Sequence, residues 1–150
     1  MMTKRQKIIS AKFISVLVIT AAAAFTMLNV KDFTNRREGM NAMTQLGEQI
    51  REYKKSRGSL PSESYVEDAR LKLAGAVRLG AVRYRAIWLT YDSAPDTILA
   101  YIEKRYHSLF LDSGYIVMRL DGTVEWMEKI PFETRLAEQQ SLEEIKTTQK

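Results

Sequence analysis

Residues Phe13–Val30 read FISVLVITAAAAFTMLNV and contain no charged side chain. An α-helix rises about 1.5 Å per residue, so a helix of this length nearly matches the ~30 Å hydrocarbon core of a bilayer. Ile8 and Ile9 extend the apolar character toward the N-terminus, and the long side chain of Lys12 can reach the polar interface. The sequence therefore predicts a transmembrane helix over residues 13–30.

The residues before this stretch are basic. Residues 1–12 contain four basic and no acidic side chains, and such a flank favours a cytoplasmic N-terminus. We therefore expect a single-pass protein that contacts membrane lipid through residues 13–30. Residues 31–150 would then form an extracytoplasmic head, in the periplasm or at the cell surface.

The same segment also fits a cleaved secretory signal. Residues 1–12 would be its charged region, residues 13–20 its apolar region, and the alanines at 21–24 its small-residue cleavage site. The product would be a secreted or periplasmic module released near Ala24. A buried core helix of a soluble domain is a third interpretation. The first two interpretations both place residues 32–150 outside the cytoplasm.

Composition and charge narrow the function classes. The chain has 150 residues, 45% hydrophobic and 27% charged, with a net charge of +5 and no cysteine. Disorder, disulfide bridges, thiolate metal sites and thiol nucleophiles are thereby excluded. Residues 1–31 hold five basic and no acidic side chains, which leaves 18 of each in residues 32–150. Because the head is neutral, we expect no nucleic-acid partner.

Helical periodicity continues beyond the apolar stretch. Between Thr34 and Arg57, apolar residues recur in steps of three and four, which predicts an amphipathic helix that ends at Gly58. If the two helical stretches are continuous, one long N-terminal helix results, although polar residues at positions 29–35 also allow a break. A short helix is expected over Glu63–Leu73, with Ser62 as its N-cap. The apolar residues of the amphipathic stripe are Met40, Met43, Leu46, Ile50 and Tyr53.

The pattern then changes to short strands. Alternation over Val82–Trp88 predicts a half-buried strand, and Asp121-Gly122 is the strongest hairpin signal in the chain. A C-terminal helix is expected with Pro131 at its first position. This order predicts an α+β domain with its helices on one face of a small antiparallel sheet. The other expected strands are Thr97–Ile102, Tyr115–Leu120 and Thr123–Met127, with a turn at Asp92–Asp96.

The segment from Leu99 to Gln139 resembles the C-terminal half of prepilin-type proteins with a His-then-Asp-Gly motif, of the planctomycete type. The motif residues that match are His107, Asp121 and Gly122. Glu48–Pro61 is similar to the end of the long helix in pseudopilins. The chain shows no prepilin cleavage site ahead of Phe13. The resemblance therefore implies a pilin-like or pseudopilin-like head on an ordinary membrane anchor.

No pattern specifies a catalytic or cofactor site. His107 is the only histidine, and no spacing around it indicates a catalytic triad, so a hydrogen-bonded or solvated loop histidine is the expected role. One histidine and no cysteine exclude most zinc sites. Four loop aspartates could gather oxygen ligands around calcium, but they fit turn capping equally well. They are Asp92, Asp96, Asp112 and Asp121.

Five basic residues without an intervening acid lie between Ala69 and Tyr91. They could contact acidic lipid headgroups or an acidic partner. They could also form a solvated strand face whose charges discourage edge-to-edge pairing. The solvated face is the favoured interpretation; a contact face, if these residues form one, would comprise Arg78, Arg83 and Arg85.

These observations predict a membrane-anchored structural or interaction protein without catalytic activity. Pilin-like or secretion components of a type II secretion or type IV pilus-like system are its expected protein partners. The alternative is the released ligand-binding or enzymatic module.

Overall fold

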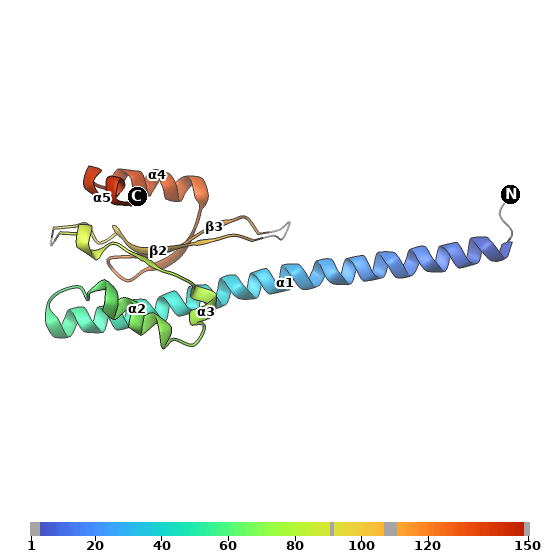
Figure 1. Ribbon diagram of the computed structural model, residues 1–150, viewed down its shortest axis with the longest axis horizontal. Coiled ribbons are helices and arrows are strands. Elements are labelled where there is room, and N and C mark those ends of the chain that lie inside the picture. The colour runs from blue at the N-terminus through green and yellow to red at the C-terminus, as the bar shows by residue number, and fades with distance from the viewer. Residues whose placement is uncertain (1–3, 91, 107–110, 149–150) are drawn as a thin grey trace.

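The computed structural model describes residues 4–90, 92–106 and 111–148 (Figure 1). Its first element, α1 (Lys4–Arg57), is one helix of 54 residues, about 80 Å long at 1.5 Å per residue. The apolar and the amphipathic stretches are therefore continuous, without a break at residues 29–35. The next residue, Gly58, has a φ of +72° and donates its N–H to the Lys54 carbonyl at 2.8 Å, as glycines that end helices do.

Two short helices, α2 (Glu63–Leu71) and α3 (Ala76–Leu79), contact the C-terminal half of α1. The predicted N-cap is confirmed, because the Ser62 hydroxyl accepts the Tyr65 N–H at 3.3 Å. α2 ends two residues before the expected position, and Leu73 is buried in the core after the helix has ended.

The sheet contains four antiparallel strands in the order β1-β2-β3-β4. Three of them lie within two residues of their predicted positions. Of the strand predicted over Val82–Trp88, only Arg83 and Tyr84 pair in the sheet. The prediction is wrong for the residues that follow, because Arg85 leaves the extended conformation (φ −109°, ψ 10°) and precedes a 3₁₀ helix, η1 (Ala86–Trp88). The strands are β1 (Arg83–Tyr84), β2 (Ile98–Lys104), β3 (Gly114–Arg119) and β4 (Val124–Glu128).

The C-terminal segment forms two helices where the sequence predicted one. α4 (Lys129–Gln139) and α5 (Leu142–Thr148) are separated at Gln140, which is extended (ψ 138°). Pro131 is the third residue of α4 and not the first. It is still tolerated there, because the N–H groups of a first helical turn have no partner within the helix.

Helices cover both faces of the sheet, which corrects the expectation that they would share one face. Figure 1 shows α1, α2 and α3 below the sheet and α4 and α5 above it. Strand residues alternate between two cores accordingly. Ile116 and Met118 of β3 pack toward α1, whereas Val117 packs against Phe132 of α4. The α+β class predicted from the sequence is confirmed.

Two glycines allow α1 to approach the sheet closely. A Cβ atom on Gly39 would lie 2.9 Å from Cδ1 of Ile116, and one on Gly47 would lie 2.9 Å from Sδ of Met118. Both distances are shorter than real Cβ contacts, so a larger residue at either position would force the Ile116 or Met118 side chain to shift. These glycines therefore leave room for side chains of β3 against α1, although each is a poor helix former.

Candidate functional site

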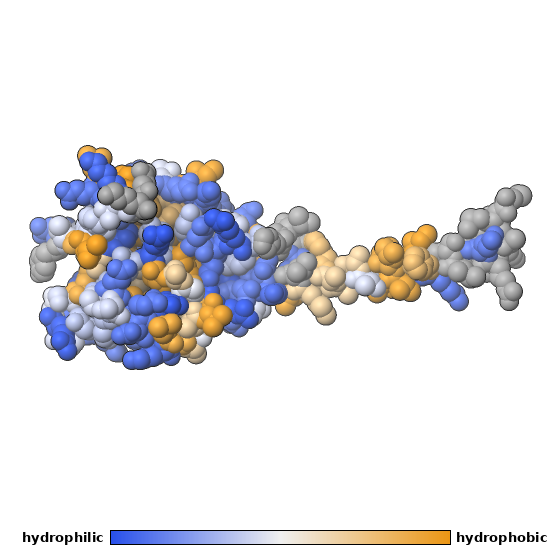
Figure 2. All heavy atoms as spheres, viewed as in Figure 1, coloured by the Kyte–Doolittle hydropathy of each residue, from blue (hydrophilic) through white to orange (hydrophobic). Residues whose placement is uncertain are grey.

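The N-terminal half of α1 is apolar and exposed. The helix from Lys12 onward contains an 18-residue window with a mean hydropathy of 2.1, none of it buried within the protein. Phe13 is 69% exposed and Met27 is 74% exposed. Figure 2 shows this hydrophobic segment projecting from a largely hydrophilic head. By length and composition, the helix can cross a membrane.

A pocket of about 200 Å³ lies where this half of α1 meets the head. We call it the junction pocket. Three segments that are distant in the sequence form it: the part of α1 directly after the apolar stretch, α3, and the end of β2. Its lining residues are Asp32, Asn35, Val77, Arg78, Lys104, Arg105 and Tyr106.

Three cationic side chains line the junction pocket and differ in their partners. Arg78 pairs with Glu38 at 3.2 Å, and Arg105 pairs with Glu103 at 2.8 Å. Lys104 instead donates to backbone carbonyls, those of Arg78 and, at 3.1 Å, of Leu79. Burial, and then the charge of Arg78, lower the pKa of Lys104. In the described part of the chain, Lys104 has no carboxylate partner.

An aromatic stack adjoins the pocket. The ring centroids of Tyr106 and Trp126 are 5.7 Å apart. The Arg36 guanidinium lies over the Trp126 ring, 4.1 Å from its centroid. Burial raises the pKa of Tyr106 to about 12. The Tyr106 hydroxyl is buried and makes no hydrogen bond with residues 4–90, 92–106 or 111–148.

Of the three residues predicted to form a basic contact face, two are exposed and one is buried. Arg78 is exposed at the junction pocket, and Arg83 is exposed on the edge strand β1. Arg85 is only 3% exposed and forms a two-point ion pair with Glu144 of α5, at 2.6 Å and 2.9 Å. Its assignment to a surface is therefore wrong, since it is a buried structural residue.

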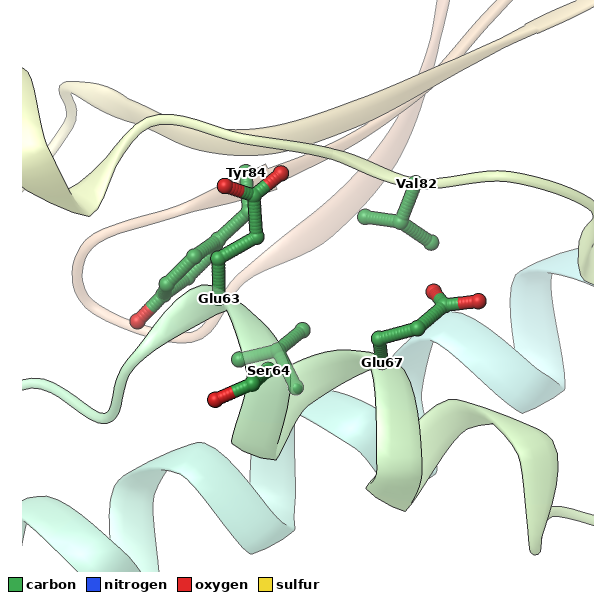
Figure 3. Close-up of a pocket in the computed structure, with 6 residues that line it drawn as sticks. Glu63, Ser64, Glu67, Val82 and Tyr84 are labelled. Atoms are coloured by element: carbon green, nitrogen blue, oxygen red, sulfur yellow. The ribbon is translucent and has the colours of Figure 1, made fainter.

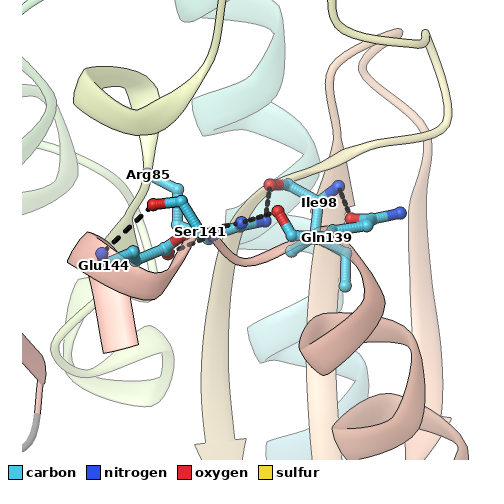
Figure 4. Close-up of polar contacts among 5 residues, drawn as sticks. All are labelled: Arg85, Ile98, Gln139, Ser141 and Glu144. Atoms are coloured by element: carbon cyan, nitrogen blue, oxygen red, sulfur yellow. Dashed lines mark hydrogen bonds and ion pairs between the residues drawn. The ribbon is translucent and has the colours of Figure 1, made fainter. Parts of the chain in front are cut away.

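The Arg85–Glu144 pair connects α5 to the sheet (Figure 4). The Arg85 guanidinium also donates to the carbonyls of Ile98 (2.7 Å) and Gln139 (3.0 Å). The Gln139 side chain in turn accepts the Ile98 N–H at 2.8 Å. This network satisfies the buried charges, which is the condition for a buried ion pair to persist.

The Asp121-Gly122 turn is at the opposite end of the sheet from the junction pocket. The hairpin prediction is confirmed, with β3 and β4 paired on either side and a φ of +88° at Gly122. The Asp121 carboxylate accepts the Thr123 N–H at 2.8 Å, and this hydrogen bond lowers the pKa of Asp121. His107, the other motif residue, lies outside the described residues.

The aspartates proposed for calcium are not gathered into one site. Across the described residues, no group of three or more histidine, cysteine or acidic side chains could hold a metal ion. Asp96 forms an ion pair with Arg135 at 2.8 Å, and Asp121 caps its own turn. Asp121 therefore agrees with the turn-capping interpretation, whereas Asp96 has a structural role as an ion-pair partner.

A second pocket, of about 390 Å³, lies between α2 and β1. Figure 3 shows Glu63 and Glu67 pointing the same way from successive turns of α2, with Val82 and Tyr84 opposite. The carboxylate of Glu67 is bound by Arg70 at 2.5 Å. The Tyr84 hydroxyl donates to the Pro61 carbonyl at 3.1 Å. Glu67 and Tyr84 are therefore engaged within the protein, whereas Glu63 and Ser64 also line the pocket.

No protein-family model, curated protein or solved structure matches the chain. Function must therefore be inferred from the residues themselves. Sequence reasoning did not single out Lys104, Tyr106 or Trp126, because the junction pocket forms only when α1, α3 and the end of β2 come together in the folded head. The one available signal was the Lys-Arg-Tyr run at the end of an apolar strand.

Proposed function

We propose that this protein is a single-pass membrane protein that presents a pilin-like or pseudopilin-like head outside the cytoplasm and acts by binding other proteins. The observation that carries the proposal is the continuity of α1. One unbroken helix leaves its apolar half exposed and packs its other half into the core of the head. A head attached in this way is held at a fixed height above a membrane.

The exposed side chains give the energetic reason for membrane insertion. Removing one large apolar side chain from water stabilises a protein by roughly 1.5–3 kcal/mol. Nine such side chains are exposed between residues 13 and 30, so their transfer to lipid is strongly favourable. They are Phe13, Ile14, Val16, Leu17, Val18, Ile19, Phe25, Met27 and Val30.

Other features support the orientation and the interaction role. The acid-free basic flank at residues 1–12 favours a cytoplasmic N-terminus. A long N-terminal helix packed on an antiparallel sheet, with an Asp-Gly hairpin near the C-terminus, agrees with the resemblance to pilin-like proteins. Two polar groups of the pocket between α2 and β1, Glu67 and Tyr84, are engaged in structural contacts. A type II secretion or type IV pilus-like assembly is the setting that we propose.

The anchor is tested by carbonate extraction of membranes that contain the full chain. The wild-type protein should stay in the pellet. Val18→Arg places a charge near the middle of the span, at a cost of about 3 kcal/mol, and should shift protein to the supernatant. Val18→Leu is the matched control and should behave as the wild type. Release of a soluble product that begins at Ala24 or Phe25 would contradict the proposal and support the secreted alternative.

The absence of cysteine makes the orientation directly measurable. Single-cysteine variants Gln6→Cys and Ser59→Cys place a thiol on either side of the proposed span, at exposed positions. A membrane-impermeant maleimide added outside the cytoplasmic membrane should label only Ser59→Cys. Labelling of Gln6→Cys alone would reverse the orientation. Co-purification of pilin-like or assembly-platform proteins from detergent extracts would support the proposed setting, and isolation as a lone monomer would count against it.

A further inference from the structure

The junction pocket lies at the height of the lipid headgroups, given the membrane insertion proposed above. Asp32 and Asn35 follow Val30 by two and five residues, which is about 3 Å and 7.5 Å along a helix. The headgroup layer on each side of a bilayer is about 5–8 Å thick. The lining residues on α1 are therefore within that layer.

The rest of the pocket faces the same layer because of how the sheet is placed. Figure 1 shows that the end of the sheet where β2 finishes and β3 begins points along α1 toward its N-terminal half. Lys104, Arg105 and Tyr106 are at this end. Val77 of α3, at the rim, is 90% exposed, so an apolar side chain accompanies the polar ones, as suits a surface that touches lipid.

One cation of the lining, Lys104, has a donor left for an anion. Three cations face one lining carboxylate, Asp32, which makes an interaction of its own. The nearby carboxylates of Glu38 and Glu103 balance Arg78 and Arg105. Lys104 is different, because its ammonium has two carbonyl partners and no compensating carboxylate in the described part of the chain. An ammonium carries three N–H donors, so one remains to be satisfied.

The Tyr106 hydroxyl adds a neutral donor. It is buried at the pocket and has no hydrogen-bond partner among the described residues. Such unpaired buried groups are uncommon in proteins and call for a partner. An anion in the pocket would satisfy the remaining Lys104 donor, and it would also satisfy the Tyr106 hydroxyl once the ring turns to expose that atom to the pocket.

We propose that the junction pocket binds the phosphate of an anionic membrane lipid, with Lys104 as the principal contact and Tyr106 and Arg105 as supporting donors. The pocket volume of about 200 Å³ is below that of sites for drug-sized ligands and suits a single headgroup. Lipid binding here would fix the rotation of the whole molecule about the α1 axis within the membrane, since the pocket lies on one side of the helix. This inference rests on the proposed membrane insertion.

The test uses the full chain in a neutral detergent. Trp126 adjoins the pocket, so its fluorescence in a Trp88→Phe background reports binding. Phosphatidylglycerol and phosphatidylcholine with identical acyl chains are added separately. The wild type should bind phosphatidylglycerol at least about fivefold more tightly, the selectivity expected from one basic side chain near an anionic surface. Equal affinity for the two lipids would overturn the proposal.

Variants locate the site. Lys104→Gln should lose the selectivity, and Lys104→Arg should retain most of it. Arg83→Gln removes the same charge from the edge strand β1, outside the lining of the junction pocket, and should leave the selectivity unchanged. A loss as large in Arg83→Gln as in Lys104→Gln would show general charge attraction and overturn the proposal.

Because Lys104 also binds the last carbonyls of α3, circular dichroism checks that the Lys104→Gln variant is folded. If Lys104→Gln is unfolded, Arg105→Gln, at an exposed position, replaces it and should reduce the selectivity at least twofold.

Inorganic phosphate distinguishes the source of the anion. It should compete with phosphatidylglycerol only weakly, because it lacks the apolar part that Val77 and the helix contact. Tight binding of inorganic phosphate together with no preference between the lipids would overturn the lipid assignment.

Carbonate extraction separates this inference from the proposed function. A protein that stays in the membrane pellet but shows no lipid selectivity contradicts only the inference, whereas a soluble protein contradicts the proposed function.

Discussion

The two halves of α1 are both rich in apolar residues but distribute them differently around the helix. Between residues 13 and 30, large apolar side chains are exposed on every side. Between residues 39 and 50, the buried positions form one stripe: Gly39, Ala42, Met43, Leu46, Gly47 and Ile50. A stripe needs one packing partner, which the sheet supplies, whereas an all-round apolar surface needs apolar surroundings on every side. The comparison therefore assigns one half to a protein core and the other to lipid.

The largest expected effect tests whether the head folds independently of the exposed half. Glu144→Gln leaves Arg85 buried without its carboxylate and should lower the free energy of unfolding of the head by about 3–5 kcal/mol. Retention of the variant in the membrane pellet should not change. Urea unfolding in detergent, followed by near-ultraviolet circular dichroism, measures the first quantity, and carbonate extraction measures the second.

A double variant controls for the loss of charge pairing. Arg85→Met combined with Glu144→Leu removes both charges and should recover most of the stability lost in Glu144→Gln. If Glu144→Gln costs less than about 1 kcal/mol, a value typical of surface ion pairs, the described burial of this pair is wrong.

The next effect contrasts equivalent leucines in the two halves. Leu46 is fully buried, whereas Leu17 is 58% exposed. Leu46→Ala should lower the free energy of unfolding of the head by about 2–5 kcal/mol, because it leaves a cavity between α1 and the sheet. Leu17→Ala should leave that free energy unchanged in the same urea titration. A similar loss in both variants would mean that the N-terminal half also packs against the head.

A smaller effect locates the boundary between the halves. Arg36 lies over Trp126, and its replacement by Gln should cost about 0.5–1 kcal/mol of head stability through the lost cation–π contact. Arg37→Gln, at the exposed neighbouring position, is the matched control and should cost nothing measurable. Equal unfolding midpoints for the two variants would place Arg36 outside the head.

The smallest effect concerns the Asp121 turn, far from the exposed half. The Thr123 N–H lowers the pKa of Asp121 in the folded protein. The ionised carboxylate therefore stabilises the fold at pH values above the pKa of the unfolded chain, and this contribution is lost as the pH falls through the folded pKa. Asp121→Asn should lower stability at pH 7 by less than about 0.5 kcal/mol, since the group is exposed to solvent.

Two pH values measure this contribution. The difference in unfolding free energy between the wild type and Asp121→Asn should be present at pH 7 and should shrink at pH 3. A difference that grows toward pH 3 would contradict the assigned direction of the pKa shift.

Local features of the fold were predictable from the sequence because neighbouring residues determine them. The Ser62 cap, the glycine stop at Gly58 and the Asp121-Gly122 turn each depend on a few adjacent residues. The apolar run before Val30 was equally clear. These signals also sufficed for the α+β class.

Features that depend on distant residues were not predictable. The alternation at Val82–Trp88 indicated a strand, but Arg85 turns inward because Glu144, 59 residues later, supplies a buried carboxylate. α4 covers the second face of the sheet because Phe132 meets Tyr115, with ring centroids 3.8 Å apart. The junction pocket combines α1, α3 and β2, so no single segment carries its pattern. Contacts of this kind form between segments that are far apart in the chain, so no single segment shows a sequence periodicity that predicts them.

The central claim is that one helix runs from the lipid into the core of the head, and a cysteine-accessibility profile along α1 tests it most directly. Single cysteines at each position from 12 to 50, in native membranes, would be treated with a water-soluble maleimide. We predict continuous protection over residues 13–30, then accessibility that rises and falls with a helical period, with protection at the buried positions from 39 to 50. Periodic protection within 13–30 would indicate a protein-packed helix, and full accessibility there would indicate a soluble one. Either result would contradict the account.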